Sequence, residues 1–66
     1  MQLPNEVLEK WQKLRDGGDN ERLSDLTGLS DQTISNIFNG ANLKESTFII
    51  IRDFYNKRES EVEKAL

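Results

Sequence analysis

The 66-residue sequence predicts an all-α fold, a compact bundle of four to five helices around a central helix-turn-helix. Apolar residues recur at helical spacing in both halves of the chain, the pattern of amphipathic helices. Glycines follow each of the first three expected helices, where a reversal of the chain favours them. The length suits one small core, so we expect a single domain over residues 1–66, with the helix-turn-helix at about residues 20–40.

The first helix is expected from Pro4 to Arg15. Proline suits the first turn of a helix, and the acids near its start and the bases near its end match the helix dipole. Trp11 belongs to the apolar stripe of this helix, so we expect it in the core. The Asp-Gly-Gly stretch at residues 16–18 ends the helix, and Asp19 or Asn20 is expected to cap the next one.

The two helices of the central pair are joined by a turn at Gly28. Leu23 and Leu26 lie on the apolar face of the first helix, and Ser24 is small enough for another helix to cross closely beside it. Gly28 supplies the positive φ that ends this helix, and Leu29 follows as its hydrophobic contact. These residue types occur at the spacing that a tight helix-turn-helix requires.

The second helix of the pair separates its residues into an apolar face and a polar face. Ser30 or Asp31 is expected to cap its start, and Gly40 to end it. At about 100° per residue, the side chains of one face point to the core. The core face carries Ile34, Ile37 and Phe38, and the opposite face carries Gln32, Ser35, Asn36 and Asn39.

The polar face is the feature that points to a function. An ordinary solvated helix face holds Lys and Glu, which form helices better than Ser and Asn do. Gln and Asn amides can make paired hydrogen bonds to the N6 and N7 edge of adenine, and Ser can bond several base edges. Two interpretations carry equal weight from these residues alone: a surface that reads DNA bases, or polar side chains that are merely tolerated there.

The stretch LSDLTGLSDQTISNIFNG resembles the helix-turn-helix of the phage-repressor and Cro type, the family also called xenobiotic-response-element regulators. The match lies in the motif itself and covers the flanking helices more loosely. The resemblance implies a lambda-repressor-like bundle that binds double-stranded DNA, usually as a dimer, with the second helix of the motif in the major groove. It rests on Leu23, Ser24, Thr27, Gly28, Leu29, Ser30, Ile34, Ser35, Ile37, Asn39 and Gly40.

The resemblance also implies DNA contacts for residues of this chain. Two positions depart from the family. Asn20 stands where many members have the longer Gln, and the charge of Asp31 would have to cap the helix or accept from cytosine N4. The residues expected to face base edges are Asp31, Gln32, Ser35 and Asn36. The residues expected near phosphates are Asn20, Ser30, Thr33, Asn39, Asn42 and Lys44.

The charge of the chain argues against a nucleic-acid partner, because 9 basic residues face 12 acidic ones and the net charge is −3. Basic surfaces normally supply much of the affinity for phosphate. The local distribution matters more than the total. Between Leu29 and Lys44 the only charges are Asp31 and Lys44, so the expected contact surface is nearly neutral. Non-specific binding is therefore expected to be weak and to depend little on salt.

The composition excludes several kinds of chemistry. The sequence has no cysteine and no histidine, which removes disulfides, thiol nucleophiles, histidine bases and the usual zinc sites. No pair of carboxylates stands in a recognisable catalytic setting, so we expect neither an enzyme nor a cofactor. The longest strongly apolar stretch, residues 48–51, is too short for a signal peptide or a membrane span, and we expect a cytoplasmic protein.

Residues 41–44 are expected to form a loop near the DNA backbone, and Ser46 or Thr47 to cap a further helix. One long helix, or two helices with a break at residues 56–60, both fit the pattern. A strand over residues 48–51 is conceivable because these residues favour extended structure, but the charged sequence that follows favours a helix. The expected apolar stripe of this helix is Phe48, Ile51, Tyr55, Val62 and Leu66.

This last helical region carries more apolar residues than one small bundle easily buries. Either they complete the core over Trp11, or some of them leave an exposed patch for a second subunit. A two-fold dimer would place two copies of the DNA-reading helix one duplex turn apart on a palindrome. The candidates for this homodimer contact are Ile49, Phe54 and Tyr55.

The sequence therefore predicts a small DNA-binding transcriptional regulator, most simply a repressor that acts by occupying an operator. The alternative is a protein-interaction module that uses the helix-turn-helix as a scaffold, as an anti-repressor, an adaptor or a DNA mimic would. The acidic balance of the chain suits this second class. The electrostatic potential around Gln32 to Asn36 distinguishes the two.

Overall fold

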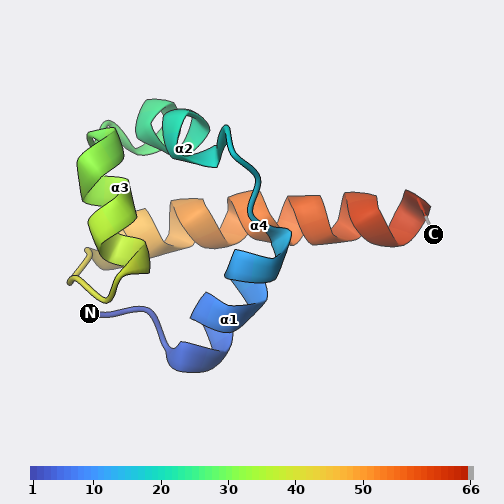
Figure 1. Cartoon of the computed structure of the whole chain (residues 1–66), viewed down its shortest axis with the longest axis horizontal. Helices are drawn as coiled ribbons and strands as arrows, with labels where there is room; N and C mark the ends of the chain where they lie inside the picture. The colour runs from blue at the N-terminus through green and yellow to red at the C-terminus, as the bar shows by residue number, and fades with distance from the viewer. Residues whose placement is uncertain (66) are drawn as a thin grey trace.

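The computed structural model describes residues 1–65, which form four helices and the segments that join them (Figure 1). They are α1 (Asn5–Leu14), α2 (Asp19–Thr27), α3 (Asp31–Phe38) and α4 (Glu45–Ala65). No strand occurs within these residues. The predicted all-α bundle with a central helix-turn-helix is confirmed, and α2 and α3 are the two helices of that motif.

α1 begins one residue later and ends one residue earlier than the sequence predicted. Pro4 is the residue before the helix, and Arg15 is extended, with a ψ of 138°, which ends the helical turn. Glu6 in the first turn and Lys13 in the last turn agree with the helix dipole. Trp11 is the buried residue of this helix, as expected.

The start of α2 differs from the prediction. Gly18 occupies the position before the helix, and no side chain caps it, so the expected cap by Asp19 or Asn20 was wrong. Asp19 is instead turned inward and is fully buried. Its carboxylate accepts a hydrogen bond from the backbone N–H of Asp16 at 3.0 Å. The side chain does not cap α2 because groups from other elements bind it.

The turn between α2 and α3 is held by hydrogen bonds as well as by glycine. Gly28 has the predicted positive φ, with a value of 76°, and its N–H donates to the carbonyl of Ser24 at 2.8 Å. The Ser24 hydroxyl donates to the Leu29 carbonyl. The Leu29 N–H donates to the Thr27 hydroxyl at 3.2 Å. Ser24 therefore closes the turn, a role that its small size alone did not indicate.

Two apolar residues are more exposed than their helical spacing suggested. Leu26 is 56% exposed, although Leu23 beside it is fully buried, because a hollow between α2 and α4 lies next to Leu26. Val62 is 46% exposed, since the second half of α4 extends past the other helices (Figure 1). Leu66, the last residue of the predicted stripe, lies outside the described residues.

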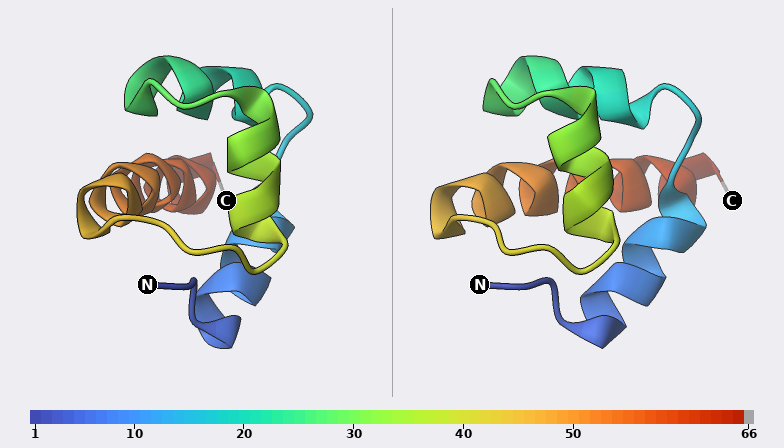
Figure 2. Two further views of the ribbon diagram at one scale, coloured as in Figure 1. Left: turned by 90° about the vertical axis from the view of Figure 1, so that its left-hand side faces the viewer. Right: turned by 60° about the vertical axis from the view of Figure 1, so that its left-hand side comes forward.

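α4 is one helix from Glu45 to Ala65, so residues 56–60 contain no break and residues 48–51 form no strand. The helix begins before Ser46 and Thr47, and neither residue can be its cap. Figure 2 shows α2 on one side of α4 and α1 on the opposite side, with α3 beside the first turns of α4. α4 therefore packs against α1 and α2, while α3 packs chiefly against α2.

Tyr55 of α4 lies at the centre of the core and contacts each of the other three helices. Its ring stacks on Trp11 of α1, with centroids 5.4 Å apart, and meets Phe38 of α3 edge-on at 6.1 Å. Its hydroxyl donates to Asp19 of α2 at 3.0 Å. Tyr55 is fully buried, so the prediction that it contributes to an exposed dimer patch was wrong.

Fully buried Asp19 and half-buried Arg58 form an ion pair next to Tyr55. Arg58 donates to the Asp19 carboxylate and, at 3.1 Å, to the carbonyl of Leu14. Burial raises the pKa of Asp19, but hydrogen bonds from Arg58, from the Asp16 amide and from Tyr55 outweigh burial, so this pKa is lowered overall. Burial and the hydrogen bond to Asp19 raise the pKa of Tyr55. The pair thus stays charged while the tyrosine stays neutral.

We expect Arg58→Met to lower the free energy of unfolding by about 3 kcal/mol, because the buried Asp19 carboxylate would lose its hydrogen-bonded cation and keep only Arg22, 3.8 Å away. Urea unfolding followed by Trp11 fluorescence measures this change. Arg52→Met is the control, since Arg52 is exposed on the same helix and its change should stay below about 0.5 kcal/mol. Equal effects of the two substitutions would contradict a special role for the Asp19–Arg58 ion pair.

Candidate nucleic-acid interface

α3 turns one face to the core and the other to solvent, as the sequence predicted. Ser30 is the N-cap, since its hydroxyl accepts from the backbone N–H of Thr33 at 3.2 Å, and Asp31 is the first helical residue. Gly40 follows the helix with a φ of 101°, which agrees with its predicted role at the helix end. The buried residues of α3 are Ile34, Ile37 and Phe38.

Gln32 and Asn36 lie one turn apart on the exposed face of α3. Nε2 of Gln32 donates to Oδ1 of Asn36 at 3.1 Å. This bond aligns the two amides along the outer side of the helix. Gln32 keeps its carbonyl oxygen and one N–H for another molecule, and Asn36 keeps both of its N–H groups. The two side chains therefore form a row of hydrogen-bonding groups whose relative orientation is set by their own hydrogen bond.

Ser35 is half-buried and is bound to α2. Nδ2 of Asn20 donates to Oγ of Ser35 at 2.8 Å, and Oδ1 of Asn20 accepts from Arg15. The Arg15 guanidinium lies over the ring of Phe38, 4.2 Å from its centroid. A continuous set of contacts therefore joins the end of α1 to α3. Because Ser35 already accepts a hydrogen bond, its own O–H remains as a donor.

The loop between α3 and α4 is held by the first residues of the chain. The N–H of Leu43 donates to the carbonyl of Met1 at 2.6 Å, and the side chain of Gln2 donates to the carbonyl of Gly40 at 2.9 Å. Leu3 and Leu43 are both buried. Sequence reasoning missed this pairing, because the two segments are far apart in the chain and neither shows a strand pattern.

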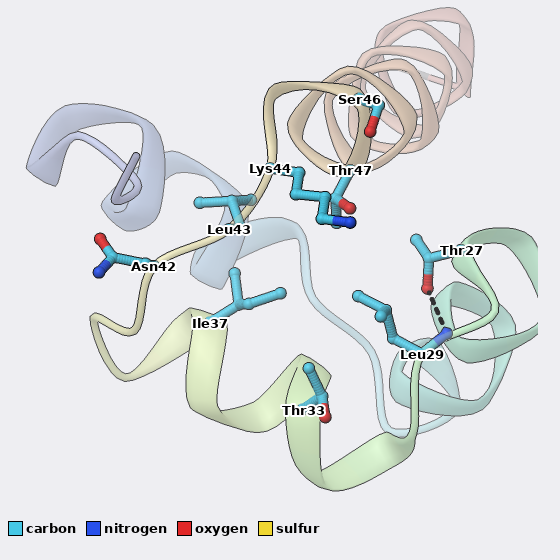
Figure 3. Close-up of a pocket in the computed structure, with 9 residues that line it drawn as sticks. All are labelled: Thr27, Leu29, Thr33, Ile37, Asn42, Leu43, Lys44, Ser46 and Thr47. Atoms are coloured by element: carbon cyan, nitrogen blue, oxygen red, sulfur yellow. Dashed lines mark hydrogen bonds between the residues drawn. The ribbon is translucent and has the colours of Figure 1, made fainter.

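A pocket of about 310 Å³ opens between the α2–α3 turn, α3 and the start of α4 (Figure 3). Three residues predicted to lie near phosphates line it, namely Thr33, Asn42 and Lys44. The side chains of Lys44 and Thr47 extend toward its middle. The pocket thus combines a positive charge with hydroxyl groups at one edge of the exposed face of α3.

The structure brings the predicted contact residues together around α3. Asn20 and Ser35 are half-buried, and the other predicted contact residues are exposed. Neither Asp31 nor Lys44 forms an ion pair within residues 1–65, so these two charges remain for a partner. The exposed predicted residues are Ser30, Asp31, Gln32, Thr33, Asn36, Asn39, Asn42 and Lys44.

Across residues 1–65, no three acidic side chains gather where they could hold a metal ion. None of the described helices is long and apolar enough to cross a membrane.

Two helices joined at a glycine turn, with the polar face of the second helix open to solvent, define a helix-turn-helix protein. A family model described as helix-turn-helix matches residues 12–62, which include α2, the turn and α3. The chain therefore belongs to this family, in its phage-repressor and Cro type. No curated protein and no solved structure matches the chain. Family membership supports double-stranded DNA as the partner and a DNA-binding regulator as the function.

We expect Asn20→Ala to lower the free energy of unfolding by about 1 kcal/mol, because Ser35 and Arg15 each lose a hydrogen-bond partner. A double-mutant cycle with Ser35→Ala isolates the bond between α2 and α3. The two changes should be non-additive by about 0.5 kcal/mol or more. Asn56→Ala, an exposed amide on α4, is the matched control and should be nearly neutral. Strict additivity would show that the Asn20–Ser35 bond contributes nothing.

Proposed function

We propose that the protein is a sequence-specific regulator that binds double-stranded DNA through α3 and represses transcription by occupying an operator. The observation that carries this proposal is the Gln32–Asn36 pair on the exposed face of α3. Gln32 offers an acceptor and a donor side by side, which complement the N6 donor and the N7 acceptor of adenine. Asn36 adds two further donors one helical turn away.

Ser35 and Asp31 would add preferences for bases other than adenine. The Ser35 hydroxyl accepts from Asn20, so it supplies a donor and favours an acceptor such as thymine O4 or guanine O6. The Asp31 carboxylate only accepts, and cytosine N4 is the major-groove donor that suits it. An operator would then combine an adenine opposite Gln32 with a cytosine near the start of α3.

The phosphate contacts flank the reading face and are mostly neutral. Ser30 and Thr33 lie at the start of α3, with their hydroxyl oxygens 2.8 Å apart. Asn39, Asn42 and Lys44 follow its end, so the residues at each end of α3 would contact one strand of the duplex. Lys44 is the one cation among the proposed phosphate contacts. Affinity would then come chiefly from hydrogen bonds and shape rather than from net charge.

Repression would follow from occupancy alone. A homodimer on a palindrome would set two copies of α3 roughly 34 Å apart and would cover the major groove on one face of the duplex. Two of the predicted dimer residues remain accessible: Ile49 is 39% exposed and Phe54 is partly exposed. Such a complex excludes other proteins from the same site without a ligand or a cofactor.

Selection from a random duplex pool tests the base contacts. The wild-type chain should enrich one sequence, and the Gln32→Ala, Asn36→Ala double variant should lose this enrichment, since each base contact contributes about 1–3 kcal/mol. Gln12→Ala with Asn56→Ala removes two exposed amides from other helices and should leave the selected sequence unchanged. If the folded wild-type chain enriched no sequence, a protein-interaction module would replace the DNA-binding proposal.

Salt dependence tests the phosphate contacts on the selected duplex. Lys44→Ala should reduce the slope of log K against log salt by about one per subunit, because one phosphate loses its neutralising charge. The control is Lys13→Ala, an exposed lysine on α1, which should leave the slope unchanged. Identical slopes for wild type and Lys44→Ala would remove Lys44 from the interface.

A further inference from the structure

A groove between α2 and α4 consists of two adjoining hollows of about 380 and 230 Å³. Phe54 and Lys57 line both hollows, which makes the groove continuous. Figure 2 shows α2 above the first half of α4, where the two helices meet. The structure describes every residue of α3, and none of them lines either hollow. A molecule seated in the groove therefore leaves the exposed polar face of α3 open.

The larger hollow is the apolar end of the groove. Leu26 of α2 lines it together with Ile50 and Phe54 of α4. Leu26 is 56% exposed, and the Phe54 ring is held on its inner side by Tyr55, which it meets edge-on at 5.1 Å. A fixed aromatic ring loses little conformational entropy when another molecule covers it, which is typical of the residues that dominate protein interfaces.

The smaller hollow is the basic end of the groove. Three cations line it, Arg22, Lys57 and Arg58, with Glu61 as the one acid. Arg58 is already bonded to Asp19, whereas Arg22 is 60% exposed and lies 3.8 Å from that carboxylate, too far for a hydrogen bond. Lys57 is exposed and forms no ion pair within residues 1–65. Arg22 and Lys57 thus keep donors for an anionic group of another molecule.

The charges around the groove favour a protein carboxylate over a phosphate backbone. The chain has a net charge of −3, yet it places three of its nine cations around one hollow. Asp53 lines the apolar end and Glu61 the basic end. A duplex carries phosphates along its whole length, so its charge would meet both of these acids. A protein segment can place an acid at the basic end and an apolar side chain at the other.

The distance between the two ends fits a helix. Lys57 follows Ile50 by seven residues of α4, which is about 10 Å along the helix axis. A second helix covers this distance in about two turns, so residues about seven positions apart on one of its faces lie over the two ends. This face would carry an apolar residue and an acid. An amphipathic helix binds a groove on another protein in this way.

We infer that the groove binds an acidic amphipathic helix of a second protein, whose apolar side chain fills the apolar end and whose acid pairs with Arg22 and Lys57. Binding here requires no DNA. If α3 contacts an operator as proposed, one chain would hold the operator and the second protein together. Phe54 is assigned to the second protein, and Ile49, which lines neither hollow, remains for the proposed contact between two copies of this chain.

Selection from a library of displayed random peptides on the full chain, without DNA, tests the inference. The enriched peptides should carry an acid and a large apolar residue about two helical turns apart. Fluorescence anisotropy of one enriched peptide then measures its dissociation constant. Lys57→Glu should raise this constant at least about tenfold through like-charge repulsion, and Leu26→Gln should raise it similarly because the groove loses apolar area.

A charge-reversed peptide separates pairing from damage to the fold. When its acid is replaced by lysine, the peptide should bind Lys57→Glu at least about tenfold more tightly than it binds wild type, since opposite charges again meet. Two matched controls lie outside the groove: Lys13→Glu on α1 repeats the change of charge, and Ile49→Gln on α4 repeats the loss of an exposed apolar side chain. Both should leave the constant unchanged, and circular dichroism establishes that every variant is folded.

Four results would overturn the inference. One is that no peptide is enriched, and another is that the controls weaken binding as much as Lys57→Glu and Leu26→Gln do. Displacement of the peptide by duplex DNA would show that the groove binds nucleic acid. Self-association that these two variants abolish, measured by sedimentation equilibrium, would show that a second copy of the chain covers the groove. The peptide selection uses no DNA, so its outcome is independent of the duplex selection.

Discussion

The burial of one tyrosine determines how the four helices fit together. The Tyr55 ring packs against Trp11 and Phe38, and a hydroxyl taken out of water needs an acceptor, which Asp19 supplies. A buried carboxylate needs a cation in turn, which Arg58 supplies. A chain of this size has little apolar surface to bury, so a single side chain that contacts the other three helices can organise the core.

The same core positions the exposed polar face of α3. α3 has only 8 residues, so its stability depends on packing rather than on helix propensity. Phe38 contacts both Tyr55 and Arg15, and Arg15 leads through Asn20 to Ser35. The orientation of one proposed base-contacting side chain is thus connected to the central ring through direct contacts. On the other side of α3, residues 1–3 hold the loop that carries Asn42 and Lys44.

Features that depend on near neighbours were predictable from the sequence. The two faces of α3, the positive φ of Gly28 and the cap at Ser30 each follow from rules that act within one or two helical turns. The exposed amides of Gln32 and Asn36 follow from the same periodicity. These are the features that define the motif, which explains why the sequence alone resembles the family.

Features that depend on distant segments were not predictable. Asp19 was expected as a cap because local rules favour it there, but its partners lie 36 and 39 residues further along the chain. Tyr55 was grouped with exposed residues because an apolar stripe does not show which member reaches the centre of a bundle. The pairing of Gln2 with the loop at Gly40 spans 38 residues and has no composition signal.

The side chains of α3 that point to solvent differ in how freely they can change. Gln32 and Asn36 bond only to each other, so their replacement leaves the core and α2 undisturbed. Ser35 is tied to Asn20, and a larger residue there would have to displace a bond between two helices. If α3 contacts DNA as proposed, operator preference would diverge readily at positions 32 and 36, while a change at position 35 would require a change at position 20. Variants with new specificities would then be sought at the first two positions.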